Sequence, residues 1–359
     1  MSTQDVVDHE LVSMMNSVFA AQRPAGDRPR RPVRLDTQLW KNLESLGLTR
    51  LTGTELAGGS GAGWHESAAL LSAAARHAVR LPLAEHDLLA GWLLEKAGLP
   101  ADDAIRTACV LDGKGIARAV PWAGAADHVV VLCDTGAGWR IADLPASEIG
   151  IGTGHNLAGE PRDDVTVDPA IVDGPAVGDE TVHEFFLRGA LARSLQMCAA
   201  LERIVQLCVA HTIEREQFGR ALARFQAVQQ LVADIAAETA LARATVDAAV
   251  GEVAPGWDGD AGFHVAVAKS CAGHAASVVV RNAHQIHGAI GTTAEHELHE
   301  FTNPVLAWRS EFGSVHHWDQ LLTTAATGAG RAGCWSLVAG PVRPSSWPHL
   351  SEVSPGAGS

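Results

Sequence analysis

Two short stretches of this 359-residue chain carry residue types that could bind an anionic ligand. The first, residues 213–229, reads IEREQFGRALARFQAVQ and contains Arg215, Gln217 and Gln226. The arginine could form charge-assisted hydrogen bonds to an anion, and the glutamines could form neutral ones. We interpret the stretch as a helix that ends at Gly219, a short turn and a second helix. The alternative is an exposed polar corner that binds nothing.

The second stretch, residues 282–293, reads NAHQIHGAIGTT at the end of a long apolar helical pattern. Gly288 and Gly291 have no side chain, so the backbone there could approach a ligand closely. The alternative is a simple C-terminal helix cap, which also favours glycine.

Seventeen histidines raise the question of a metal site. His284 with His287, and His296 with His299, each place two imidazoles on one helical face. Local spacing does not dictate an acidic third ligand for either pair, so we expect no metal. The sequence also lacks a P-loop, a dinucleotide-binding glycine pattern between strand and helix, and a nucleophile elbow.

The composition excludes several classes of partner. Lysine and arginine number 27 against 41 acidic residues, a net charge of −14, so no basic surface for nucleic acid or an anionic membrane is expected. No apolar run approaches the ~18 residues that span a bilayer. Six cysteines are scattered without a Cys-x-x-Cys pair, and residues 1–10 are polar and acidic. We therefore expect reduced thiols and a cytoplasmic location.

The elements that would hold these stretches follow an order of helices, then strands, then helices. Leu39, Leu43 and Leu46 recur at helical spacing, and the run VVVL at residues 129–132 suits a buried strand. Long helical stripes return after residue 181. We expect a mostly helical α+β protein. Its predicted parts are an N-terminal helical domain at residues 1–100, a small β domain at 101–175, a C-terminal helical bundle at 176–340 and a loose tail at 341–359.

Taken together, the two stretches resemble the acyl-CoA dehydrogenase family. Its pattern is Arg-x-x-Phe-Gly, then Phe-Gln, then a long helix and Gln-x-x-Gly-Gly-x-Gly. The corresponding residues here are 215–219, 225–226 and 285–291, with Ala289 in place of the second glycine. The resemblance implies the family's architecture of a helical domain, a β domain and a four-helix bundle, in agreement with the order of elements.

The resemblance also implies a cofactor, a reaction and partners. Family members hold FAD and convert an acyl-CoA to a trans-2-enoyl-CoA, passing electrons to an electron-transfer acceptor protein. Several flavin contacts cross a subunit interface, so a homo- or hetero-oligomer is implied. The residues carried over as flavin-binding are Arg215, Gln217, Phe218, Gln226, Gln285, Gly288 and Ala289.

At the catalytic base the sequence departs from the family's pattern. The family removes a poorly acidic α-proton with a carboxylate whose pKa is raised in a dry site, usually in a Glu-Gly pair. Ungapped counting from Gly291 places Phe312 at this position, and Glu311 lies one residue earlier. In some members of the family the base is instead a Glu directly before an Arg. Here the corresponding arginine is Arg188, the residue before it is not a Glu, and Glu184 lies one helical turn earlier. Glu311 is therefore the candidate base.

The β region is shorter than in full-length relatives and lacks their flavin-contact loop. It also lacks the strand whose tryptophan faces the flavin ring, and Trp122 could replace that tryptophan. This abbreviated form resembles small subunits of bacterial heteromeric, α2β2 acyl-CoA dehydrogenases that act on steroid side chains. Two alternatives to a complete enzyme remain. One is a flavin-supporting subunit without a base, working with a longer homologue, and the other is a non-enzymatic helical assembly protein.

Overall fold

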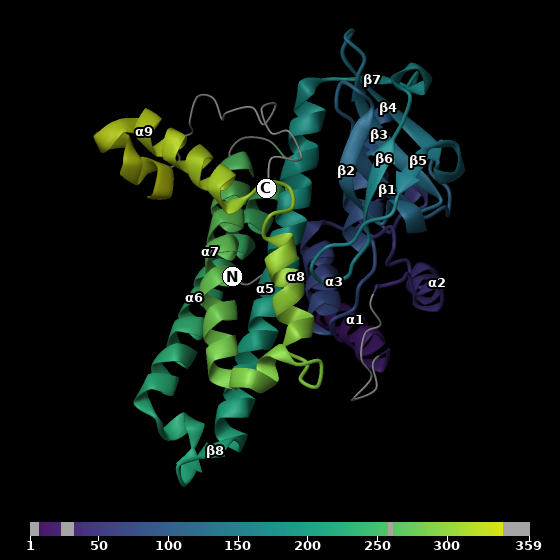
Figure 1. Ribbon diagram of the computed structural model, residues 1–359. Helices are drawn as coiled ribbons and strands as arrows, with labels where there is room; N and C mark the ends of the chain where they lie inside the picture. The colour runs from purple at the N-terminus through teal and green to yellow at the C-terminus, as the bar shows by residue number, and fades with distance from the viewer. Residues whose placement is uncertain (1–6, 23–31, 258–260, 340–359) are drawn as a thin grey trace. The chain divides into compact units, whose positions relative to one another are not determined.

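The computed structural model describes residues 7–22, 32–257 and 261–339, and in it helices precede and follow a β region (Figure 1). The predicted fold class, mostly helical α+β, is confirmed. By internal contacts the chain divides into two compact units. Among the described residues, 193–339 make up most of one unit, and 32–71 with 80–192 make up most of the other. The predicted tail at 341–359 lies outside the described residues.

Short helices begin the chain, as the leucine spacing predicted. Asp36 caps one of them, accepting hydrogen bonds from the backbone N–H groups of Gln38 and Leu39. The helices are α1 (His9–Ala21), α2 (Thr37–Ser45), η2 (Glu55–Ala57), α3 (Trp64–Arg76), the π-helix η3 (Ala84–Gly91) and α4 (Trp92–Ala97).

The β region contains two small sheets that share one core. The order of the first sheet is β1-β3-β4-β7, with β1 parallel to β3 and the other pairs antiparallel. The second is antiparallel, in the order β2-β6-β5. Cys109, Val131 and Val165, from β1, β3 and β6, belong to the shared apolar core. The strands are β1 (Arg106–Val110), β2 (Ile116–Pro121), β3 (His128–Asp134), β4 (Trp139–Pro145), β5 (Gly150–Gly152), β6 (Arg162–Thr166) and β7 (Ala176–Val177); η4 (Ala123–Ala125), η5 (Ala146–Glu148) and η6 (Pro169–Ile171) are single turns.

Long helices build the second half of the chain. Helix α7 packs against α6, α8 and α9, and an ion pair between Arg243 and Glu202 joins α6 to α5. Helix α9 bends at Gly330, where φ is 65°. The elements are α5 (Asp179–Glu214), β8 (Glu216–Gln217), β9 (Arg220–Ala221), η7 (Leu222–Arg224), α6 (Gln226–Val253), α7 (Ala261–His287), η8 (Gly288–Thr292), α8 (His299–Trp308) and α9 (Val315–Ala339).

One described segment, residues 261–292, is long and apolar enough to cross a membrane by length and composition. This segment comprises α7 and η8, and 61% of its apolar window is buried inside the protein. Burial of this kind is typical of a core helix. The described cysteines, Cys109, Cys133, Cys198, Cys208 and Cys271, are free thiols as predicted.

Candidate functional site

The arginine corner (residues 215–226) is a small hairpin, which corrects the prediction of a helix ending at Gly219. Helix α5 ends at Glu214, and β8 pairs with β9 through a two-residue turn. Phe218 and Gly219 form this turn with φ of 53° and 77°. Two successive positive φ angles suit a tight hairpin and are incompatible with a continuing helix. The glycine therefore serves the turn and does not cap α5.

The side chains of the arginine corner face solvent. Arg215, Gln217 and Gln226 are exposed, and Phe218 is 91% exposed. The ring of Phe225 anchors the corner, because the Arg220 guanidinium lies 4.1 Å from its centroid and the Phe218 ring contacts its edge. An aromatic ring exposed to this degree has its apolar surface free for a partner or ligand. Both alternatives from the sequence, an anion site and a polar corner, are compatible with this exposure.

The glycine bend (residues 285–291) follows directly from the end of α7. Gly288 has a φ of 62° just after the last helical residue, so it does cap the helix, as the simpler alternative held. A Cβ at Gly288 would meet nothing within 4 Å, whereas one at Gly291 would come within 2.7 Å of His287 Cβ. Gln285 and Ala289 are exposed. Gly288 thus borders open space, and Gly291 is required for packing.

The arginine corner and the glycine bend lie at the same end of the helical bundle. His211, four residues before Arg215, stacks on His287 with ring centroids 4.4 Å apart. His287 directly precedes Gly288. The fold therefore brings together two stretches separated by about 70 residues, at the lower end of α5 and α7 in Figure 1.

Glu311 lies in the turn between α8 and α9, where it forms an ion pair with Arg193. Arg193 Nε donates to Glu311 Oε2 at 2.6 Å, and the Arg193 side chain is only 3% exposed. The next residues, Phe312 and Gly313, have φ of 53° and 102°. The Arg193 guanidinium also lies 5.7 Å from the Phe312 ring centroid. A short bond to a buried guanidinium stabilises the charged carboxylate.

A buried lysine adds a second positive group beside this pair. Lys269 of α7 is 1% exposed and donates from Nζ to the Trp308 carbonyl at 2.7 Å. Burial lowers the pKa of Lys269 to about 7; the Glu311 carboxylate opposes the shift, and Arg193 adds to it. Sequence reasoning missed both Arg193 and Lys269. The signal for Lys269 was a lone charge within the apolar run VAVAKSCA.

The fold separates Glu311 from the other predicted site residues of the same chain. Lys269 lies close to Glu311, and His287 lies 18 positions further along α7. At ~1.5 Å of rise per residue these positions are about 27 Å apart along the helix. Glu184, the other candidate carboxylate, pairs with Arg188 one turn later, at 2.8 Å. One chain therefore does not bring Glu311 and the glycine bend to a single point.

Comparison with known sequences identifies one family. Residues 178–314 match the model described as "Acyl-CoA dehydrogenase, C-terminal domain". The acyl-CoA dehydrogenase FadE27 of Mycobacterium tuberculosis is 26% identical over 311 residues, which is 75% of this chain and 82% of that protein. The acyl-CoA dehydrogenase IpdE2 of the same organism is 28% identical over 276 residues, 74% of this chain and 79% of that protein.

Solved structures share the fold. The ChsE4-ChsE5 complex from Mycobacterium tuberculosis matches with a TM-score of 0.77 at 21% identity, covering 89% of this chain and 96% of that chain. The Tcur3481-Tcur3483 steroid acyl-CoA dehydrogenase variant matches at 0.76 and 22% identity, covering 89% and 98%. A glutaryl-CoA dehydrogenase from Mycobacterium smegmatis in complex with FADH2 matches at 0.76 and 15% identity, covering 90% and 96%. Residues 178–314 thus match the C-terminal domain of the acyl-CoA dehydrogenase family, and the chain shares its fold with these solved structures over about nine tenths of its length.

Proposed function

We propose that this chain is one subunit of a heteromeric acyl-CoA dehydrogenase, in which it helps to bind FAD at a subunit interface and does not supply the catalytic base. Two observations support the heteromer. The structures with similar folds include the ChsE4-ChsE5 complex and the Tcur3481-Tcur3483 pair. The residues that would contact the flavin are exposed on this chain.

The arginine corner and the glycine bend fit the phosphate side of a dinucleotide. Arg215 would pair with a pyrophosphate oxygen, and Gln217 or Gln285 would donate neutral hydrogen bonds. The open space at Gly288 lets a phosphate approach the backbone. When bound, FAD supplies the acceptor for the substrate hydride. The protein residues at this end bind and orient the cofactor.

The residues of this chain fit the flavin ring less well than they fit the phosphate side of the dinucleotide. Trp122, which could have replaced the family's ring-facing tryptophan, is 3% exposed and begins a turn within the β region. Its side chain belongs to the core, so it cannot stack on a cofactor. The ring contacts would then come from a longer partner subunit.

The ion pair between Arg193 and Glu311 carries the proposal that this subunit lacks the base. A base for a thioester α-proton needs a raised proton affinity, which a dry apolar site provides. Glu311 instead bonds to a buried guanidinium at 2.6 Å, with Lys269 nearby. The ion pair with Arg193 stabilises the ionised carboxylate and so makes it a weaker base. Glu311 then orders the turn after α8, and the base comes from the partner.

The proposed substrate is a CoA thioester with a bulky, ring-bearing acyl group. The support is the similarity of the fold to a steroid acyl-CoA dehydrogenase. Dehydrogenation at the α and β carbons would give the enoyl-CoA, with the α-proton leaving to a carboxylate and the β-hydride to the flavin.

The test is co-expression of this chain with a longer acyl-CoA dehydrogenase homologue from the same genome. We expect the isolated chain to be inactive and the complex to be yellow and to reduce an artificial electron acceptor. In the complex, Glu311→Gln should keep turnover per bound flavin within about twofold. It should also lower stability by ~1–3 kcal/mol, because Arg193 loses a charged partner. Steady-state kinetics normalised to flavin absorbance, with thermal melts, measure both effects.

Arg215→Gln is the matched comparison, because it removes a charge at the other end of the bundle. It should lower flavin content without the loss of stability expected for Glu311→Gln. Turnover by this chain alone would contradict the proposal, and so would a Glu311→Gln complex that is folded and flavin-loaded but inactive. A stable complex without flavin would favour the non-enzymatic assembly protein.

A further inference from the structure

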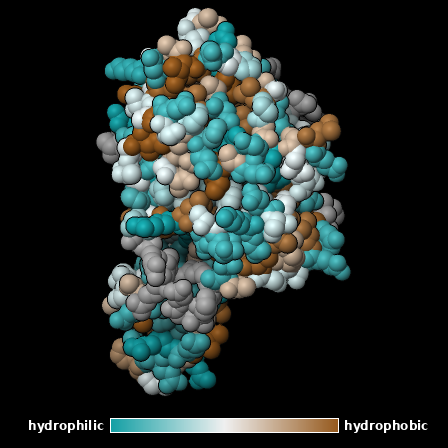
Figure 2. Space-filling model, turned by 90° about the vertical axis from the view of Figure 1, so that its right-hand side faces the viewer, coloured by the Kyte–Doolittle hydropathy of each residue, from teal (hydrophilic) through white to brown (hydrophobic). Residues whose placement is uncertain are grey.

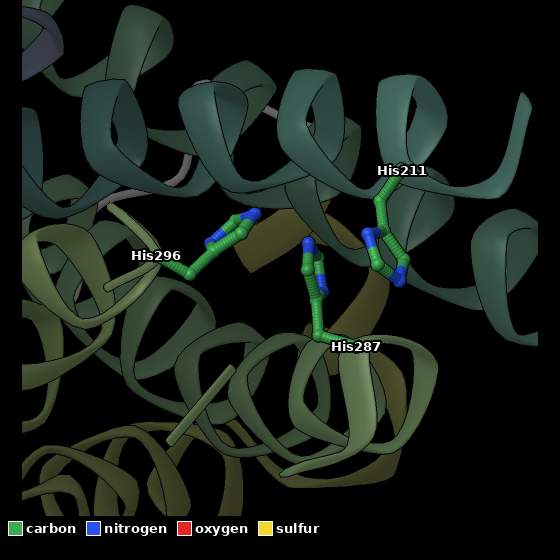
Figure 3. A group of neighbouring side chains, drawn as sticks. All are labelled: His211, His287 and His296. Atoms are coloured by element: carbon green, nitrogen blue, oxygen red, sulfur yellow. The ribbon is translucent and has the colours of Figure 1, made fainter. Parts of the chain in front are cut away.

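Three histidines that are distant in the sequence meet at the end of the bundle. His211 lies on the last turn of α5, His287 ends α7, and His296 lies in the loop before α8. One ring nitrogen from each lies within 4.8 Å of the other two. Figure 3 shows the three rings gathered between α5 and the segment that follows α7. Neither sequence pair, His284 with His287 or His296 with His299, forms this group.

His287 presents an unused lone pair to the group. Its Nδ1 lies 2.8 Å from the Ala283 carbonyl oxygen, so Nδ1 carries the hydrogen and donates it. The Nε2 atom then has the lone pair, and it is buried without a hydrogen-bond partner among the described residues. A buried polar atom without a partner is uncommon in folded proteins and points to an unseen water or ion. A backbone carbonyl on the second ring nitrogen is also the usual support of a metal-bound histidine.

The surroundings lower the pKa of all three rings. Burial lowers the pKa of His287 to about 4; the Ala283 bond opposes this, while His211, His296 and His284 add to it. Burial, with the positive charges of neighbouring groups, also lowers the pKa of His211 and His296. The acidic neighbours oppose this shift, because Glu214 raises the pKa of His211 and Glu297 raises the pKa of His296. Neutral imidazole is the form that binds metals.

The spacing of the rings is close to that of a bound ion. Zinc–nitrogen bonds of ~2.0–2.1 Å in a tetrahedron place ligand nitrogens about 3.4 Å apart. The nitrogens here, within 4.8 Å of one another, would need to close by about 1.4 Å at most. The rings of His287 and His296 already lie 4.6 Å apart between centroids. Movements of the side chains over this distance would complete the site.

His296 is the ring that must adjust. Its Nδ1 accepts a hydrogen bond from the Leu298 N–H at 3.0 Å, which leaves the proton on Nε2. Binding through Nε2 requires that this bond be released or that the ring turn over. The backbone beneath it is held in place, because His299 Nδ1 donates to the His296 carbonyl at 2.7 Å. Gly291 lets the same loop pack directly on His287.

We propose that His211, His287 and His296 bind one divalent transition-metal ion, with zinc as the ion that fits best. Three imidazoles suit zinc in a tetrahedral site whose fourth position is open to water. The ion would join the ends of α5 and α7 to the loop before α8. This proposal does not depend on the proposed function, because the ligands belong to one chain and need no flavin.

The experiment uses the full chain without a histidine tag. Metal-free protein is titrated with zinc chloride against a coloured chelator, and retained zinc is measured by mass spectrometry after gel filtration. We expect about one zinc per chain. Zinc should also raise the melting temperature by several degrees, because it binds only the folded form. Cobalt in place of zinc should give the intense visible bands of a tetrahedral site.

The variants separate the site from adventitious binding by the other histidines. His287→Gln and His296→Gln should each weaken zinc binding at least tenfold and remove the melting shift. His316→Gln, at an exposed position on α9, should behave like the wild type. Circular dichroism of the metal-free variants checks that they fold. Equal zinc retention by wild type and folded His287→Gln would overturn the proposal, as would a wild type that binds no zinc.

Discussion

At the scale of the residue, Lys269 illustrates how burial changes an ordinary side chain. It is 1% exposed in the middle of α7, with Arg193 and Glu311 as its charged neighbours. Removing an ammonium group from water disfavours its charged form, so its pKa falls. The single hydrogen bond from Nζ to the Trp308 carbonyl does not replace a hydration shell. The lysine therefore destabilises the folded chain at every pH at which it remains protonated.

Replacing this lysine should change how stability depends on pH. The folded chain releases the proton near pH 7, whereas the unfolded chain keeps it up to its ordinary pKa of 10.5. The unfolded state therefore binds more protons between about pH 7 and 10, and stability should fall as pH drops through this range. Lys269→Met should flatten this slope and stabilise the protein at pH 7 by about 1 kcal/mol.

Urea unfolding at several pH values measures the effect of Lys269→Met. Lys41→Met, at an exposed position on α2, is the control and should retain the wild-type slope. A Lys269→Met protein with an unchanged slope would show that Lys269 titrates normally in the folded state.

At the scale of the element, the π-helix η3 concentrates buried polar groups. Glu85, His86 and Asp87 are all buried within its eight residues. Asp87 accepts hydrogen bonds from the Thr52 N–H at 3.1 and 3.2 Å, and His86 Nδ1 accepts one from the Arg106 N–H. The wider turn directs three successive polar side chains into the protein, which a regular helix rarely does. The element thus links the segment around Thr52 to β1.

We expect Asp87 to make stability fall as pH rises from about 4 to 7. Burial raises its pKa from 3.8 to about 7, against the opposing hydrogen bonds from Thr52 and Gly53 and the charge of Arg188. The folded state then binds more protons than the unfolded state in this range. Asp87→Asn should remove the slope and stabilise the protein at pH 8 by ~1–3 kcal/mol.

Thermal melts from pH 4 to pH 8 provide the measurement for Asp87→Asn. Glu44→Gln, at an exposed position on α2, is the matched control, for which no change of slope is expected. A steeper decline in Asp87→Asn than in the wild type would contradict the assignment.

At the scale of the whole molecule, apolar side chains remain on the surface. Figure 2 shows hydrophobic residues in small groups among hydrophilic ones on the face it draws. Phe218 is the most exposed aromatic residue in the part of the chain that the structure describes. Ile213 and Ile290, at the same end of the bundle, are also exposed. Large exposed apolar residues at a predicted cofactor site are typical of an interface between subunits.

Substitution at Phe218 should weaken assembly without unfolding the chain. Asparagine tolerates positive φ, so Phe218→Asn keeps the hairpin turn between β8 and β9. Loss of the ring should weaken association with the partner subunit at least tenfold, as expected when an aromatic anchor is removed. Analytical ultracentrifugation of the co-expressed complex measures this change.

Leu56→Asn supplies the control for the assembly experiment. Leu56 is fully exposed on η2, in the other compact unit. Its replacement should leave association unchanged. Equal affinities for Phe218→Asn and the wild type would place the subunit interface elsewhere.

The sequence alone determined the helical and extended segments, because their hydrophobic periods are local. It also singled out the arginine corner and the glycine bend, through a resemblance carried by residues 215–219 and 285–291. It misjudged the end of α5, since the hairpin turn at Phe218 depends on a strand pairing that helical periodicity does not report.

Only the tertiary structure decided which charges and rings meet. Arg193 and Glu311 are 118 residues apart, and the two ligands His211 and His287 of the proposed metal site are 76 apart. Contacts over such distances depend on how helices pack, and no local spacing encodes them. The same packing buried Lys269 and paired Glu311, the carboxylate that the sequence had marked as the candidate base, with the guanidinium of Arg193.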